Sequence, residues 1–231
     1  GVKSIGLNAF CDCKSLKSVV IPEGVTSIGT NAFFGCESLK SVVIPEGDVV
    51  ISAGAFFGCR SLTSVEIPKG VTSIGWGTFF KCTSLKSVVI PEGVSSIEEG
   101  TFDGCTSLES ILITDGITRI GANVFARCES LESIVIPEGV ESIGLNAFNG
   151  CKNLNVIIFP DNYFNEERTM ESEKDRLGIP DGTKLVTKSE FSTMCTSIKE
   201  IYSGENRFIG KDGKGETKFA GQVLLLCEIS K

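Results

Sequence analysis

The chain has 231 residues, 41% of them hydrophobic, with a formal net charge of −7 and a pI near 4.9. This length suits one or two domains with a hydrophobic core. The acidic balance argues against nucleic acid as a partner, because phosphates call for clustered Lys and Arg.

A 23-residue unit repeats seven times without a gap, from residue 2 to residue 162. Its best copy, residues 25–47, reads V-T-S-I-G-T-N-A-F-F-G-C-E-S-L-K-S-V-V-I-P-E-G. A fixed period of this length predicts a solenoid, in which near-identical coils stack on one another.

Five large apolar positions recur in every copy of the unit. In the second copy they are Ile28, Phe33, Leu39, Val42 and Ile44. No single coil can bury its own apolar face, so we expect these columns to form one shared interior between neighbouring coils.

Residues 16–22 and their equivalents are expected to form strands. Val19 and Ile21 lie two apart and would face the core, whereas Ser18 and Val20 would face outward. Stacked in register, these strands form a parallel ribbon, and Pro22 ends the strand because it lacks the N–H that a ladder needs.

The rest of each coil is expected to be short segments. Residues 25–28 form a second extended piece, and residues 30–35 form a compact helical or 3₁₀ turn. A closing glycine at positive φ is expected in most copies, with Asn162 in the last. These glycines are Gly24, Gly47, Gly70, Gly93, Gly116 and Gly139.

The pattern I-G-x-x-A-F-x-x-C-x-x-L-x-x-V-x-I-P, for instance residues 28–45, resembles the BspA-like class of leucine-rich repeats over about 161 of 231 residues. The resemblance implies an α/β-type solenoid, a leucine-rich repeat arc with a parallel strand ribbon. It also implies kinship with cell-surface and secreted proteins of host-associated bacteria, among them adhesins that bind host, matrix or microbial proteins. An extracellular or cell-surface location follows from the resemblance alone, because the sequence contains no targeting segment.

The chain opens inside a repeat, so we expect it to be a fragment of a longer protein, and the missing targeting signal carries no weight. The longest apolar run, residues 223–227, is too short to span a membrane, so we expect no membrane insertion.

Seven of the ten cysteines form a column, one in each coil. A disulfide ladder, a metal site and a stack of small buried thiols are the possible interpretations. We expect buried, reduced thiols, because free cysteine packs as a small hydrophobe and an odd column would leave one thiol unpaired. Zinc is not expected without His or a Cys-x-x-Cys pair, whereas Cys195 and Cys227 remain a possible disulfide. The column is Cys13, Cys36, Cys59, Cys82, Cys105, Cys128 and Cys151.

Residues 163–231 lie outside the repeat, which occupies residues 1–162. We expect an exposed charged helix or linker at 165–177, a strand at 184–187, a helix at 189–202 capped by Ser189, a hairpin loop at 210–215 and a final strand at 219–229. This α+β tail either covers the last coil or forms a small independent domain.

The sequence predicts no enzyme and no cofactor. It has no His, and its Ser and Thr residues follow the repeat, as scaffold residues do. An acidic column beside the closing glycines, with members such as Glu23, Glu92 and Glu138, is interpreted as a solvated edge.

The outward face of the strand ribbon is the candidate binding site for a protein partner. An aliphatic row there is a surface that a partner can cover, although valine also suits any strand. The row is Val20, Val43, Glu66, Val89, Leu112, Val135 and Ile158. The flanking row changes its charge along the chain and would orient a partner: Lys17, Lys40, Lys86, Glu109 and Glu132.

Two other functions remain open. The repeats are a structural spacer that presents the tail, or the tail is a small catalytic or ligand-binding domain. A spacer would keep the ribbon face uniformly polar, so the aliphatic row favours a binding scaffold of the adhesin type.

Overall fold

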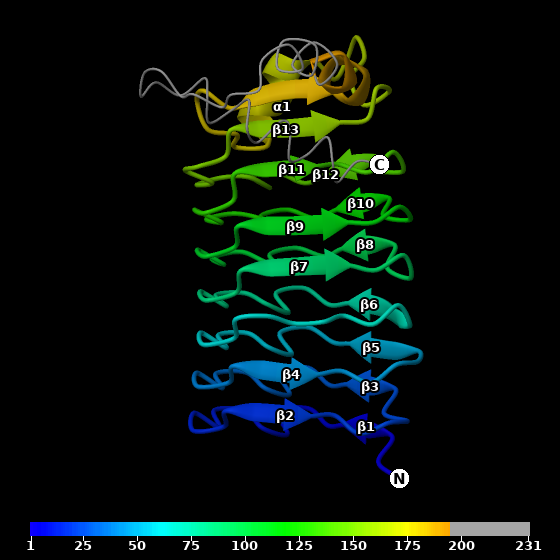
Figure 1. Cartoon of the computed structure of the whole chain (residues 1–231), viewed down its shortest axis with the longest axis vertical. Coiled ribbons are helices and arrows are strands. Elements are labelled where there is room, and N and C mark those ends of the chain that lie inside the picture. The colour runs from blue at the N-terminus through cyan, green and yellow to red at the C-terminus, as the bar shows by residue number, and fades with distance from the viewer. Residues whose placement is uncertain (195–231) are drawn as a thin grey trace, which may run out of the picture.

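We describe residues 1–194 of a computed structural model of the chain. The coils stack one above the other into a column, with the N-terminal coil at one end and the tail at the other (Figure 1). Every coil but the third contributes two parallel strands, and these line up as two separate ribbons along the column.

The main ribbon contains the longer strands. It comprises β2 (Ser18–Val20), β4 (Ser41–Val43), β7 (Ser87–Ile90), β9 (Ser110–Ile113), β11 (Ser133–Val135), β13 (Val156–Phe159) and β14 (Lys184–Thr187). The second ribbon comprises β1 (Ser4–Ile5), β3 (Ser27–Ile28), β5 (Val49–Ile51), β6 (Val71–Ile74), β8 (Ser96–Ile97), β10 (Arg119–Ile120) and β12 (Ser142–Ile143). Both predicted extended segments are therefore confirmed as strands in every coil but the third, whose main-ribbon segment forms only isolated bridges.

The strands that pair do so in the register of the repeat, whereas β6 with β8 and β9 with β11 share no ladder. Val19 pairs with Val42, and Ile111 pairs with Val88. The third coil joins the main ribbon only through bridges at Ser64 and Glu66. Equivalent residues of neighbouring coils therefore stand side by side, and every column of the repeat becomes a physical stack.

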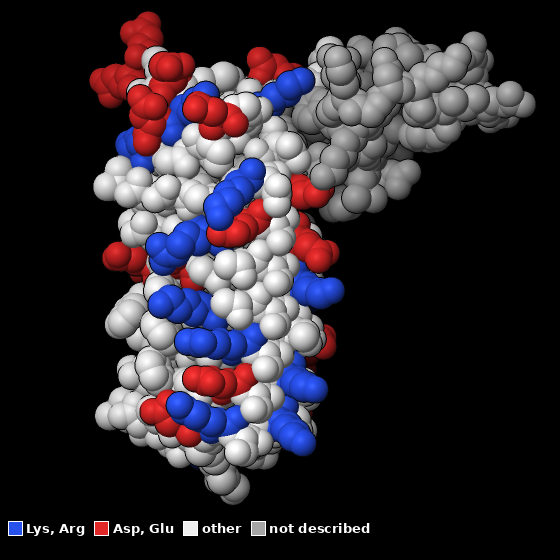
Figure 2. Space-filling model, turned by 90° about the vertical axis from the view of Figure 1, so that its left-hand side faces the viewer, with Lys and Arg blue, Asp and Glu red and all other residues white. Residues whose placement is uncertain are grey.

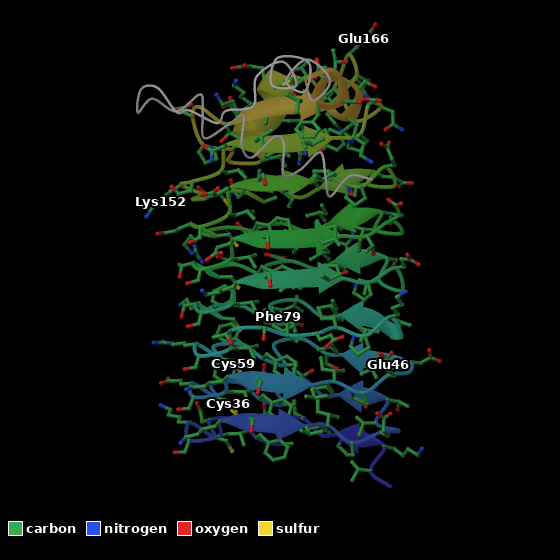
Figure 3. All side chains as sticks on the ribbon, in the orientation of Figure 1. Cys36, Glu46, Cys59, Phe79, Lys152 and Glu166 are labelled. Atoms are coloured by element: carbon green, nitrogen blue, oxygen red, sulfur yellow. The ribbon has the colours of Figure 1, made fainter. Side chains whose placement is uncertain are left out.

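The phenylalanine column forms the centre of the core. Phe33, Phe56, Phe79, Phe102, Phe125 and Phe148 are fully buried, whereas Phe10 in the first coil is 39% exposed. Consecutive rings lie nearly parallel, with centroids 5.1–6.0 Å apart and interplanar angles of 1–17°. Figure 3 labels Phe79 within this stack.

The turn at residues 30–35 differs from the helical or 3₁₀ turn that the sequence predicts. The amide of Ala32 bonds to the carbonyl of Gly29, and that of Phe34 to Asn31, as in successive tight turns. Asn31 and Gly35 have φ values of 54° and 68°, which break any helical continuation. Two left-handed residues per coil therefore turn the chain here.

The prediction of a positive φ at the closing glycines is only partly right. Gly24, Gly47 and Gly116 have φ values of 82°, 117° and 110°, but Gly70, Gly93 and Gly139 do not lie in this region. A Cβ on Gly70 would lie 2.1 Å from the carbonyl oxygen of Gly47. There the close approach of two coils, rather than backbone conformation, requires glycine.

The cysteine column is buried in six of its seven members. Each of these six thiols donates to the carbonyl of the phenylalanine one coil earlier, with Sγ–O distances of 3.1–3.3 Å. Burial raises the pKa of Cys36 to about 11 and that of Cys151 to about 12. Cys13 is exposed, so the prediction of burial is wrong for it, because it packs against the second coil alone.

The first part of the tail adds an irregular coil to the stack. Helix α1 (Met170–Arg176) is capped by Thr169, and Leu177 after it is fully buried in the core. The amide of Phe148 donates to the carbonyl of Leu177, and β14 pairs in parallel with β13. The predicted strand at 184–187 is confirmed, but the charged helix is not fully exposed, because Glu173 is buried.

A second helical segment, residues 188–194, follows β14 directly. The Thr187 hydroxyl accepts from the amide of Glu190, and the Glu190 carboxylate accepts from the amide of Thr187. Thr187 is therefore the cap, and the prediction of Ser189 is wrong. Predictions that concern Cys195, Cys227, the helix beyond 194, the loop at 210–215 and the strand at 219–229 lie outside the described residues.

Phe79→Ala is expected to lower the free energy of unfolding by about 3–5 kcal/mol, because it opens a cavity between two rings of the stack. Phe80 is only half-buried and stacks on Phe57 with centroids 4.5 Å apart. Phe80→Ala is the matched control and should cost about 1 kcal/mol. Urea denaturation of both variants measures the difference, and equal losses would contradict this account of the turn.

Alkylation with iodoacetamide should separate the cysteines by position. At neutral pH the buried, protonated thiols of Cys59, Cys82, Cys105 and Cys128 should stay unlabelled in the native protein, because the thiolate is the reactive form. Cys13 should react readily, and unfolding in urea should make all five reactive. Peptide mapping by mass spectrometry reads each site, and native labelling or disulfide pairing of the buried four would refute the prediction.

Candidate functional site

The aliphatic row of the main ribbon points to solvent along most of the column. Val20, Val43, Val89 and Leu112 are 72%, 54%, 50% and 47% exposed. Val20 pairs with Val43 and Val89 with Leu112, so each lies beside its equivalent in the next coil. Glu66 is exposed in the same row and bridges to Val43.

The C-terminal end of the row is covered by the chain itself. Ile158 is 2% exposed, and it forms a small apolar cluster with Val156, Val186 and Phe191. Val135 and Met194 pack against this cluster. The prediction that Ile158 lies on the exposed face is therefore wrong, because helical residues 188–194 cover it.

The flanking row runs along the edge where the main strands begin. Lys17, Lys40, Lys86 and Glu109 are exposed, and Glu132 is half-buried. The Lys40 amide donates to the Lys17 carbonyl, and the Glu109 amide to the Lys86 carbonyl, so the row stays in register. The structure thus places the predicted change from basic to acidic residues beside the aliphatic row.

The acidic column lies at the opposite edge, where the main strands end. Figure 3 shows Glu46 projecting from this edge and Lys152 from the other. Lys188 lies 2.8 Å from the Glu138 carboxylate. Asp161 accepts from the amide and the hydroxyl of Ser189, and these bonds lower the pKa of its carboxyl group. Two of these acids therefore hold the start of the helical segment at 188–194.

A further set of charges forms a ladder along the edge that precedes the main strands (Figure 2). Lys152 lies 2.7 Å from Glu129, and Arg127 lies 2.7 Å from Asp103. The exposed pair of Lys152 and Glu129 contributes at most about 1 kcal/mol, whereas Asp103 of the other pair is buried. They accompany the stacking of coils and make no cleft, so this edge is not a candidate site.

The most enzyme-like group in the described residues surrounds Glu173, beside a shallow hollow lined also by Ser142 and Arg168. Its carboxylate accepts from Tyr163 Oη at 2.8 Å and from Arg176 Nε at 2.8 Å. Burial alone would raise the pKa of Glu173, but these bonds outweigh burial and hold it below its ordinary value. An ionised carboxylate with both oxygens bonded is poorly suited to accept a proton. Arg176 also donates to the carbonyl of Ile143, which joins α1 to the last coil.

Within residues 1–194, no three Cys, Asp or Glu side chains come together as a metal site. In the same range, no helix is both long and apolar enough to cross a membrane.

The aliphatic row could be predicted from the sequence because its period matches the repeat. The sequence did not predict that a helix covers the C-terminal end of the row, although the T-K-S-E sequence at residues 187–190 carries the signature of a capping box. That signature marks where the helix begins, but it does not tell which surface the helix covers.

Several solved structures of leucine-rich repeat proteins are similar to this chain. A leucine-rich repeat protein from T. pallidum is 31% identical, with a TM-score of 0.47, over 56% of this chain and 72% of that one. A leucine-rich cell surface protein from Faecalibacterium prausnitzii is 28% identical, with a TM-score of 0.39, over 81% and 64%. A leucine-rich repeat protein from Bacteroides ovatus is 22% identical, with a TM-score of 0.45, over 80% and 75%. No curated protein matches the sequence.

The sequence itself matches the family described as BspA type Leucine rich repeat region, in six copies, over residues 3–132, 49–172 and 118–212. These ranges cover most of the chain, and the stacked coils with their parallel ribbons are the fold that such repeats form. The chain belongs to the BspA-type leucine-rich repeat family.

Proposed function

We propose that the chain is a non-catalytic scaffold of the adhesin type, at the cell surface or secreted, that binds a protein partner. The partner lies on the outward face of the main ribbon, over the row from Val20 to Leu112. The observation that carries the proposal is the exposure of four aliphatic side chains in this row, by 47–72%.

The energetics of the ribbon favour a covering partner. Parallel sheets usually have both faces covered, because each face carries apolar side chains. Here the inner face is buried in the core, with Val42 and Val88 at 5% and 3% exposure, whereas the outer face is open. Burying an aliphatic side chain contributes about 1.5–3 kcal/mol, so a partner that covers four of them gains affinity from burial alone.

Charge supports the same face. The aliphatic row runs between the flanking row with Lys17, Lys40 and Lys86 and the acidic column with Glu46 and Glu92. Apolar residues at the centre of a patch with charged residues at its rim are typical of protein interfaces. The rim charges set the orientation of the partner and its rate of association.

A purely structural spacer is the alternative. It needs stacked coils and a soluble surface, but it needs no aliphatic row facing solvent. A catalytic tail is a second alternative, although both oxygens of Glu173, the most enzyme-like carboxylate in residues 1–194, accept bonds from Tyr163 and Arg176.

The triple variant Val43→Lys, Val89→Lys and Leu112→Lys tests the proposal. It should abolish binding of a protein captured from host-cell or matrix extract by the parent chain and then purified, with Kd measured by calorimetry. The melting temperature should fall only slightly, because these side chains lie outside the core. Val135 is left unchanged, since it packs under the helical segment at 188–194.

The matched control carries the same added charge on the second ribbon: Val50→Lys, Ser73→Lys and Ser142→Lys. These three positions are exposed and lie on a different surface. The control should bind like the parent. Equal Kd values of the partner for the triple variant and for the parent chain would contradict the proposed binding face.

A further inference from the structure

The chain already covers part of its own aliphatic row with a helix. In residues 188–194, Phe191 and Met194 are three positions apart and pack in one cluster with Ile158, while Lys188 pairs with Glu138 of the acidic column. Residues three apart lie on the same face of a helix. At the covered end of the row, therefore, the apolar face of a helix packs on the aliphatic side chains, and a basic residue of that helix pairs with the acidic edge.

The open part of the row adjoins this covered surface, with β9 beside β11, although these two strands share no ladder. Ile158 pairs with Val135 in the adjacent strand, and the outward positions Leu112 and Val89 follow in the same row. Because β2 with β4 and β7 with β9 use their backbone groups in ladders, an occupant of the open part meets mainly side chains. Addition of a strand needs a free sheet edge, whereas a helix can bind through side chains alone.

The spacing of the coils suits a helix that runs along the column. Neighbouring parallel strands lie about 4.8 Å apart, and one helical turn rises about 5.4 Å. A helix laid along the row therefore brings about one side chain to each coil. Four intervals from Val20 to Leu112 span about 19 Å, which about 13 helical residues cover.

Glu66 places a single carboxylate within the aliphatic row. It stands between Val43 and Val89 in the row and is exposed. Within residues 1–194, neither Lys69 nor any other basic side chain forms an ion pair with it. A helix that covers the row would place its middle residue over this carboxylate, so an apolar residue there would remove the charge from water without a partner.

We infer that the open row binds an amphipathic α-helix of the protein partner, whose apolar stripe carries one basic residue at its middle, over Glu66. Two apolar positions on each side of that residue pack on Val20 and Val43 and on Val89 and Leu112. Basic residues on one flank of the helix face the acidic column, as Lys188 does. This inference rests on the proposed function and names the chemistry of its partner.

Three synthetic helical peptides of 18 residues serve as probes. The first has leucines at positions 1, 5, 12 and 15, lysine at position 8 and lysines along one flank. The second differs only in glutamate at position 8. The third has the composition of the first, with the leucines scattered around the helix. Fluorescence anisotropy of labelled peptide measures binding to the parent, to Glu66→Lys and to the control Glu99→Lys, which carries the same charge change at an exposed turn position away from the row.

The parent should bind the lysine peptide at least about tenfold more tightly than the glutamate peptide, since like charges in contact are strongly unfavourable. Glu66→Lys should reverse this preference, and Glu99→Lys should keep it. The scattered peptide should not bind, and circular dichroism should show added helix when the first peptide binds.

Equal affinity of the parent for the lysine and glutamate peptides would overturn the inference, as would equal binding of the scattered peptide. So would association with phosphatidylglycerol vesicles in the absence of any peptide binding. If no peptide binds at millimolar concentration while the captured protein still depends on Val43, Val89 and Leu112, the helix is wrong and the proposed function stands.

Discussion

The fold depends on one constraint: an apolar side chain in one coil can be buried only by the same column of the next coil. The phenylalanine rings meet this constraint by stacking in parallel at 5.1–6.0 Å. The rings can stack only if every coil places its phenylalanine at the equivalent position, so the length of the repeat must stay constant. A slip of one residue would also turn every inward side chain of a strand outward. The fixed period of 23 residues is the sequence record of this requirement.

The same constraint explains the two ends of the described stack. In the first coil, Phe10 and Cys13 are exposed because no equivalent residues lie below them. At the other end, the tail no longer follows the repeat, but it still covers the apolar side chains of the last coil and pairs with its strand. Leu177 is buried in the shared core, and β14 continues the main ribbon beside β13. An irregular sequence can therefore close a regular stack when it supplies one apolar side chain and one strand in register.

Much of this architecture could be predicted from the sequence, because columns of identical residues report directly on what each position contacts. The inward and outward faces of β4 and β7 follow from alternation alone. The left-handed residues were harder to find. The column with Asn31 contains only Asn and Gly, residue types that favour a positive φ. The column with Gly35, however, includes Lys81 and Arg127 at φ values of 56° and 59°. There the demands of stacking override the preference of the residue.

The candidate site shows the limit of such reasoning. The repeat predicts that Ile158 faces outward, and it does, yet it is buried because the tail folds back over it. That contact joins residues from different parts of the chain and leaves no periodic trace. The start of the covering helix was visible in the sequence at residues 187–190, whereas its position on the ribbon depends on the pairs made by Glu138 and Asp161.

The aliphatic row must finally be weighed against the simpler explanation that valine suits any strand. The other outward-facing rows of the two ribbons allow a test of this explanation. Outward positions of the second ribbon are mostly serine, as in Ser4, Ser73 and Ser142, and the other outward row of the main ribbon begins with Ser18 and Ser41. Exposed strand positions in this fold therefore do not need β-branched residues.

Replacing an outward residue also leaves the core intact. Glu66 stands outside while its neighbours Val65 and Ile67 remain 7% and 6% exposed. The core thus tolerates a charge in the aliphatic row, although the third coil joins the main ribbon through isolated bridges rather than a full strand. Aliphatic side chains nevertheless occupy the row in every coil but the third, which supports contact with a partner as the reason for them.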